Sequence, residues 1–137
     1  IGTCLANELT KDGFANMNAH QTIYVVTPEY TTGSQIILRD NLVPMVKGKN
    51  VLILAASITT GYTVQAAIEA VNYYGGIVAG LSAIFATTHE CLGYPVTSIF
   101  DPASLPDYAS FDSRDCPLCK AGQHIDALVN SFGYSAL

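Results

Sequence analysis

Seven consecutive residues near the middle of the chain have the side chains and the backbone freedom that a phosphate-binding turn requires: Ser57, Ile58, Thr59, Thr60, Gly61, Tyr62 and Thr63. Thr59, Thr60 and Thr63 carry hydroxyls that can donate hydrogen bonds to an anionic oxygen. Gly61 can take backbone angles that other residues avoid, so successive backbone N–H groups can point at one ligand. An ordinary strand-to-helix turn capped by Ser or Thr uses the same residue types. The spacing alone leaves both interpretations open.

This turn is predicted to join a buried strand to a helix. Val51 to Ala56 is a continuous apolar run, typical of a parallel strand that is covered on both faces. Thr63 to Tyr74 places apolar residues at helical spacing, and Gly75-Gly76 should end that helix. Ile77 to Ala86 is a second apolar strand, so the three elements should fold as a right-handed parallel crossover. Ligands of open α/β sheets bind at the carboxyl ends of the strands, which is where the turn lies.

Weaker signals flank this crossover. We expect a helix over Ile1 to Lys11, a pair of strands at Thr22 to Thr27 and Gln35 to Arg39, and a further strand at Val96 to Phe100. The apolar spacing over residues 125–132 predicts a short final helix. No capping residue precedes the first helix, which favours a chain whose N-terminal elements are missing.

Composition limits the classes of function. The 137 residues suit one domain, which we predict to cover residues 1–137. Half of the residues are apolar and only 12% are charged, a balance opposite to that of a disordered chain. The net charge of −5 and the scattered cations do not form the positive surface that nucleic acid binding requires. Neither a membrane-spanning run nor a secretory signal is visible, so no membrane association and a cytoplasmic location are expected.

The segment Lys49 to Thr63 resembles the signature of type I phosphoribosyltransferases, in which a strand ends in two acidic residues followed by a loop rich in hydroxyls and glycine. Cys116-Pro117-Leu118-Cys119 is similar to the ending of many orotate phosphoribosyltransferases. The resemblance covers Lys47 to Ala86 and Asp115 to Gly122. It implies an α/β fold with the Rossmann-like parallel sheet of that family, of which this chain would be an N-terminally truncated copy.

The resemblance also implies an activity. Members of the family are glycosyltransferases of nucleotide metabolism, which pass ribose 5-phosphate from phosphoribosyl pyrophosphate to a nucleobase nitrogen with the help of Mg²⁺, and they form homodimers. The loop that matches Ser57 to Thr63 would hold the 5-phosphate. We therefore expect phosphoribosyl pyrophosphate or a nucleotide as the ligand, Mg²⁺ as the cofactor, and a homodimer that acts in pyrimidine biosynthesis.

Three departures from the family pattern weaken the expectation of catalysis. The acidic pair of the family falls on Ala55 and Ala56, whose methyl groups can neither contact the ribose hydroxyls nor favour positive charge on the sugar. Pro28 to Gly33 stands where orotate enzymes have a mobile basic loop, and it contains no Lys. Tyr62 replaces a second glycine of the loop.

Three functions follow from these departures, and no catalytic residue is assigned in any of them. The first is an orotate-type transferase with impaired activity. The alternative is a non-catalytic module that binds a nucleotide or phosphoribosyl pyrophosphate. The third is an interaction protein that has kept only the fold.

Four side chains could in principle ligate zinc: His89, Cys91, Cys116 and Cys119. One Cys-x-x-C without a second matching pair is a weak metal signal, and the family carries Cys-Pro-Leu-Cys without needing a metal. A redox motif is expected at the start of a helix that follows a strand, which this part of the sequence does not predict. The sequence therefore predicts two partly buried thiols and no metal site.

Overall fold

The computed structural model of the chain describes residues 1–11, 22–33, 35–112, 114–130 and 132–137. It divides into two compact units, Ile1–Pro106 and Asp107–Leu137. The single domain that we predicted over residues 1–137 stays a prediction. No helix of the described residues is both long enough and apolar enough to cross a membrane.

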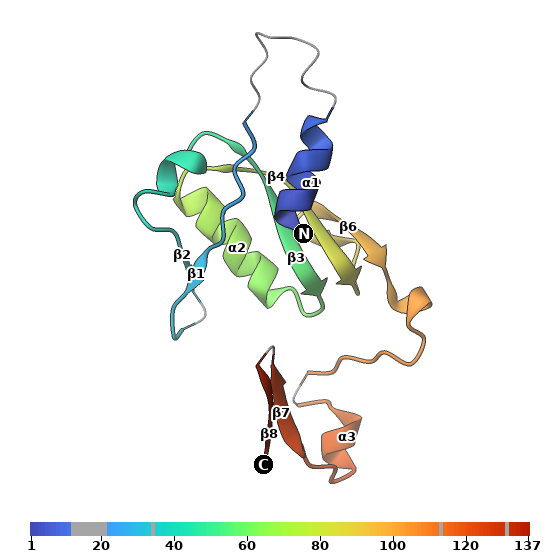
Figure 1. Ribbon diagram of the computed structural model, residues 1–137. Helices are drawn as coiled ribbons and strands as arrows, with labels where there is room; N and C mark the ends of the chain where they lie inside the picture. Colours follow the sequence, from blue (N-terminus) through green and yellow to red (C-terminus); the bar gives the residue numbers. More distant parts are fainter. Residues whose placement is uncertain (12–21, 34, 113, 131) are drawn as a thin grey trace. The chain divides into compact units, whose positions relative to one another are not determined.

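A four-stranded sheet lies at the centre of the first unit (Figure 1). Strands β3 (Asn50–Ile58), β4 (Ile77–Ala86) and β6 (Tyr94–Phe100) are parallel to one another, and the short β5 (Glu90–Cys91) pairs antiparallel with the start of β6. The strand order is β3-β4-β6-β5. Helix α2 (Tyr62–Tyr73) connects β3 to β4. The predicted strand, turn, helix and strand are confirmed, and so is an α/β fold compatible with the Rossmann-like sheet of the family.

The core of the first unit lies between α2 and one face of the sheet. Helix α2 buries Val64, Ile68 and Val71, which are spaced by four and three residues and so share one side of the helix. They pack in a cluster that includes Leu81 of β4 and Val96 of β6. Burying an aliphatic side chain of this size stabilises a fold by about 1.5–3 kcal/mol. The amphipathic sequence of α2 therefore determines which side of the helix packs on the sheet.

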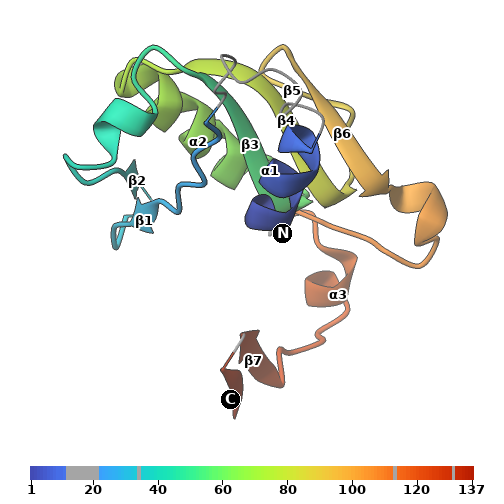
Figure 2. The same cartoon turned by 45° about the horizontal axis from the view of Figure 1, so that its top comes forward.

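The other face of the sheet is less completely covered. Leu52 and Leu54 alternate with the core-facing residues of β3, and they remain 44% and 40% exposed. Helix α1 (Gly2–Thr10) lies on this side, with Gly2 close to the Leu54 side chain, and Figure 2 shows α1 in front of β3 and β4. The helix that we predicted over residues 1–11 is confirmed, although none of its residues is buried.

The segment that precedes the sheet differs from the prediction. Residues 22–28 form no strand, and the antiparallel pair is limited to β1 (Glu29–Tyr30) and β2 (Ile36–Ile37). The strand predicted at Thr22 to Thr27 is therefore wrong, and the one at Gln35 to Arg39 is shorter than predicted. The β-branched side chains of residues 22–27 are mostly exposed, so neither burial nor a cross-strand partner stabilises extended pairing there. A 3₁₀ turn, Val43–Met45, leads on to β3.

The second unit is a small helix followed by a hairpin. Helix α3 (Pro117–Lys120) precedes strands β7 (Ala127–Asn130) and β8 (Gly133–Ala136), which pair antiparallel. The helix predicted over residues 125–132 is therefore wrong. The apolar side chains that suggested the helix are exposed, so no burial stabilises a helix there. The Phe132 N–H donates a hydrogen bond to the Asn130 side chain instead.

Candidate phosphate-binding site

The turn after β3 is shorter than the sequence predicted. β3 continues through Ser57 and Ile58, because these residues keep their pairing with Phe85 and Ala86 of β4. Ile58 is 2% exposed and belongs to the core, so its side chain cannot contact a ligand. Thr59, Thr60 and Gly61 form the connection, and α2 begins at Tyr62. The seven predicted residues thus divide between a strand end, a three-residue turn and the first turn of a helix.

Gly61 determines how the helix begins. Its φ of +81° lies in the left-handed region, and its carbonyl accepts the first bond of the helix from the Gln65 N–H, at 2.8 Å. No side chain caps this end of α2, so the Ser- or Thr-capped turn that the sequence also allowed is not the one that forms. The first N–H groups of a helix have no acceptor within the helix, and the helix dipole adds positive potential there. The turn therefore presents backbone donors that no side chain caps, at the carboxyl end of β3.

Thr87, directly after β4, fixes the position of the turn. Its N–H donates to the Ile58 carbonyl at 2.9 Å, and its hydroxyl donates to the Thr59 carbonyl at 2.9 Å. The carbonyls at the start of the turn are thereby satisfied by the neighbouring strand. Thr60 and Thr63 are exposed, so their hydroxyls are accessible to a ligand. The sheet therefore holds a turn that is rich in hydrogen-bond donors, which is the arrangement that anion-binding turns use.

Two other side chains border the turn. Tyr62 stands where the family has a second glycine, and its side chain is 73% exposed at the start of α2. The Cys91 sulfur lies close to Gly61, because a Cβ at Gly61 would stand 3.4 Å from it. No local sequence pattern points to Cys91 at the turn, because this contact depends on where the pairing with β6 places β5.

The cation nearest Pro28 to Gly33, the segment that stands where the family has its basic loop, is already paired. The Arg39 guanidinium donates two hydrogen bonds to the Glu29 carboxylate, across the β1–β2 hairpin. The hydrogen bond with Glu29 and then its charge raise the pKa of Arg39 above its ordinary value. Arg39 therefore serves the hairpin, and the segment between the two strands supplies no other base for a pyrophosphate group.

The residues at the end of β3 do not fit a protein-held Mg²⁺. Mg²⁺ requires oxygen ligands, usually carboxylates, whereas Ala55 packs against the core and Ala56 is exposed as a methyl group. Within the described ranges, no group of three or more His, Cys, Asp and Glu side chains gathers where it could hold a metal ion. A magnesium ion at this turn would have to be brought by the phosphates of its ligand.

A second concave region lies along β6 and was not anticipated from the sequence. A cavity of about 300 Å³ is lined by His89, residues 96–101 and Ser104. Asp101 accepts hydrogen bonds from the Ser104 hydroxyl and N–H, at 2.9 and 3.0 Å, where it caps the 3₁₀ turn Pro102–Ser104. The Ser104 hydroxyl and then its N–H lower the pKa of Asp101. This carboxylate is therefore committed to the turn that it caps.

The thiols of the second unit differ in exposure. Cys116 is half-buried, as predicted, whereas Cys119 is exposed. Cys116 also directly precedes α3, so the motif stands at the start of a helix that the sequence did not predict, although the element before that helix is the 3₁₀ turn Pro102–Ser104 and not a strand. The residue pattern there was too short to reveal a helix of one turn.

Part of the chain is similar to known enzymes. The orotate phosphoribosyltransferase of Caldanaerobacter subterraneus subsp. tengcongensis is 32% identical over 76 residues, which cover 56% of this chain and 39% of that protein. The orotate phosphoribosyltransferase of Pelotomaculum thermopropionicum is 32% identical over 75 residues, 55% of this chain and 38% of that protein. The chain thus spans about two fifths of the length of these curated relatives. No family model matches it.

Proposed function

We propose that this chain is a phosphoribosyltransferase-type protein whose turn at Thr59 to Thr63 binds a phosphate of phosphoribosyl pyrophosphate or of a nucleotide. The observation that carries the proposal is the uncapped start of α2 at Gly61, at the carboxyl end of a parallel strand, where ligands of such sheets bind. The similarity to two orotate phosphoribosyltransferases, over about half of the chain, supports the same ligand class.

The proposed activity is transfer of ribose 5-phosphate to a nucleobase, at an impaired rate. Positive charge builds on the sugar as its bond to pyrophosphate breaks, and Ala55 and Ala56 offer no carboxylate to stabilise it. Arg39 is held by Glu29 and does not neutralise the leaving pyrophosphate. Removing one preorganised electrostatic partner from a transition state costs about 3–4 kcal/mol, or 10²–10³ in rate. Binding should therefore survive better than turnover.

The alternative is a module that binds the same ligand without transfer. Ala55 and Ala56 favour it, because they remove the charges that catalysis needs and leave the backbone donors of the turn in place. A homodimer is part of both forms of the proposal. Large exposed aromatic side chains, such as Tyr62 and Tyr73, are of the kind that bury at subunit interfaces.

Titration calorimetry with phosphoribosyl pyrophosphate and Mg²⁺ tests the binding step. We expect wild-type binding of about 4–8 kcal/mol, in the micromolar to millimolar range. The double variant Thr60→Ala/Thr63→Ala should bind at least about tenfold more weakly, because hydrogen bonds to a charged group contribute about 1.5–3 kcal/mol each. Blocking the turn with Gly61→Trp is less clean, since φ is +81° and the Cys91 sulfur lies close by.

Thr97→Ala is the matched control. Thr97 is an exposed threonine of β6, paired with Ser82 in the middle of the sheet, so it loses a hydroxyl away from the turn. The affinity of Thr97→Ala for phosphoribosyl pyrophosphate should equal that of the wild type. An equal loss in both variants, or no heat from a folded wild type, would sink the proposal. Turnover with orotate then separates the transferase from the binding module.

A further inference from the structure

Two cysteines of the second unit lie one helical turn apart. Cys116 directly precedes α3 and Cys119 is the third residue of that helix, which lies in the 107–137 part of Figure 1. The Cys119 N–H donates a hydrogen bond to the Cys116 sulfur at 3.5 Å. All four cysteines of the chain are free thiols. The local backbone holds the Cys116 sulfur beside Cys119.

The two thiols differ in acidity because each influences the other. The Cys119 N–H and then the Cys119 thiol lower the pKa of Cys116. The hydrogen bond with Cys116 and then its charge raise the pKa of Cys119. Since the thiolate is the nucleophilic form, Cys116 is the thiol that attacks first and Cys119 is the one that follows.

The spacing permits a bond between the two sulfurs. Cys116 caps α3 in an extended conformation, and the hydrogen bond from the Cys119 N–H holds its sulfur 3.5 Å from the Cys119 nitrogen. A disulfide requires Cβ atoms about 3.5–4.5 Å apart, so closing the bond needs at most a small shift of this one turn of backbone. None of the described residues of this unit is buried, so little packing resists such a shift. Cys116 is only partly buried and Cys119 is exposed, so an oxidant can reach the Cys116 sulfur and Cys119 can follow.

We propose that Cys116 and Cys119 form a reversible intramolecular disulfide, which makes residues 107–137 a redox-responsive unit. This role is independent of phosphate binding at the turn after β3. The ring closed by the bond spans only four residues, so it removes little chain entropy and stabilises the fold weakly. Exposed disulfides of this kind are the ones that are readily reduced again.

The exchange is balanced with a low-molecular-weight disulfide as oxidant. The Cys116 thiolate attacks one sulfur of the oxidant, which forms a mixed disulfide and releases one small thiolate. The Cys119 thiolate then attacks the Cys116 sulfur, which breaks the mixed disulfide and releases the second small thiolate. The protons of the two cysteines end on the two released thiols, and two electrons pass from the cysteine pair to the oxidant.

Intact-mass analysis of the full chain with Cys4→Ser and Cys91→Ser tests the proposal, because these substitutions leave only the pair. After equilibration with oxidised and reduced glutathione, we expect a monomer lighter by two hydrogens, with no thiol left to alkylate. Dithiothreitol should restore both thiols. At lower pH, alkylation of Cys116 should persist after that of Cys119 has stopped, because the pKa of Cys116 is the lower one.

Single variants in the same background assign the order of attack. With Cys119→Ser, Cys116 should retain glutathione as a mixed disulfide, because the resolving thiol is gone. With Cys116→Ser, the mixed disulfide at Cys119 should form more slowly. Stable double glutathionylation of the parent, or disulfides only between chains, would overturn the proposal. So would thiols that resist oxidation until a chelator removes a bound metal ion.

Discussion

Helices α2 and α3 end in the same way, although one lies in the core of the first unit and the other in the second. After α2, Gly75 takes a φ of +75°, and the Gly76 N–H bonds the Val71 carbonyl at 2.8 Å. After α3, Gly122 takes a φ of +73°, and the Gln123 N–H bonds the Leu118 carbonyl at 3.0 Å. Both are Schellman endings, in which a left-handed glycine lets the chain satisfy the last carbonyls.

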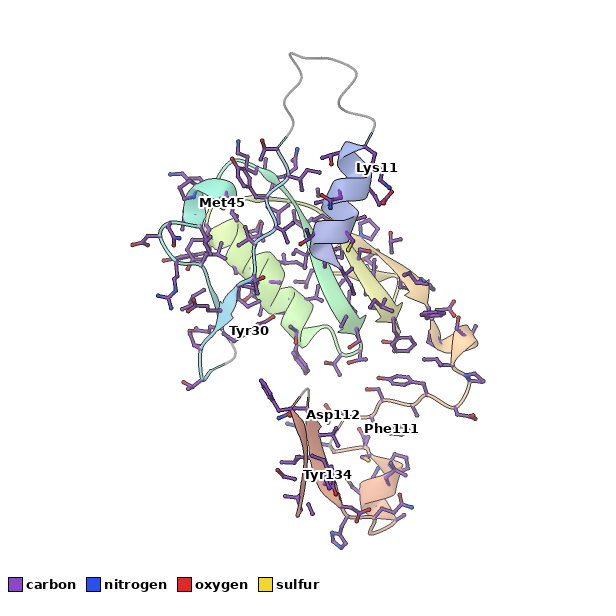
Figure 3. The ribbon with its side chains drawn as sticks, in the orientation of Figure 1. Lys11, Tyr30, Met45, Phe111, Asp112 and Tyr134 are labelled. Carbon is purple, nitrogen blue, oxygen red and sulfur yellow. The ribbon has the colours of Figure 1, made fainter. Side chains whose placement is uncertain are left out.

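The surroundings of the two helices are otherwise unlike. Each buried hydrophobic residue of the described chain falls between Val46 and Val96, in the first unit. In the second unit Phe111 and Tyr134, labelled in Figure 3, are 46% and 77% exposed. A correct helix ending thus forms with or without a core around it. Local hydrogen bonding sets the path of the backbone, whereas burial supplies most of the stability.

Truncating a leucine in each unit should show the largest difference. Leu81 is 2% exposed in β4, so Leu81→Ala removes buried methyl groups and leaves a cavity. We expect it to lower the free energy of unfolding by about 2–5 kcal/mol, measured by urea denaturation. Leu128 of β7 is 60% exposed, and Leu128→Ala should change that free energy by less than about 0.5 kcal/mol. Similar losses in the two variants would mean that the second unit contributes to the same core.

The two glycines offer a closer comparison, since the backbone strain is matched. Gly75→Ala and Gly122→Ala each place a Cβ in the left-handed region, at a cost of about 1–2 kcal/mol. The first should lower the free energy of unfolding of the sheet by that amount, because α2 is part of its core. The second should leave that transition unchanged and speed hydrogen exchange at the Gln123 N–H. An equal shift of the main transition in both would contradict the separation of the two units.

Sequence reasoning succeeded where pattern and burial agree. The apolar runs at Val51 to Ala56 and Ile77 to Ala86 were placed correctly because these strands line the core, and Gly75-Gly76 marked the end of α2. It failed at Thr22 to Thr27 and at residues 125–132, where apolar side chains remain exposed. The spacing of apolar residues predicts a strand or a helix only if another element packs against them, and the spacing itself does not show whether that element exists.

The site was predictable in the same uneven way. The place of the turn between strand and helix followed from the sequence, and so did the absence of an acidic pair at Ala55 and Ala56. Three features depend on how β4 and β5 pair and pack beside the turn. They are the burial of the Ile58 side chain, the hydrogen bonds from Thr87 to the turn, and the approach of Cys91 to Gly61. Contacts between residues so far apart in sequence leave no local pattern to read.

The smallest expected effect concerns a turn of the first unit in which residue type and backbone disagree. Leu92 and Gly93 join β5 to β6 with φ of +51° and +81°, the signs of a type I′ hairpin turn. Asn tolerates the left-handed region better than Leu does, and Leu92 is 58% exposed, so little burial is lost by replacing it. Leu92→Asn should therefore raise the free energy of unfolding by less than about 1 kcal/mol, and Leu92→Val should lower it. If Leu92→Asn lowers the free energy of unfolding in urea denaturation, then the packing of the exposed leucine contributes more to stability than its backbone strain costs. Burial would then determine stability at this turn as well.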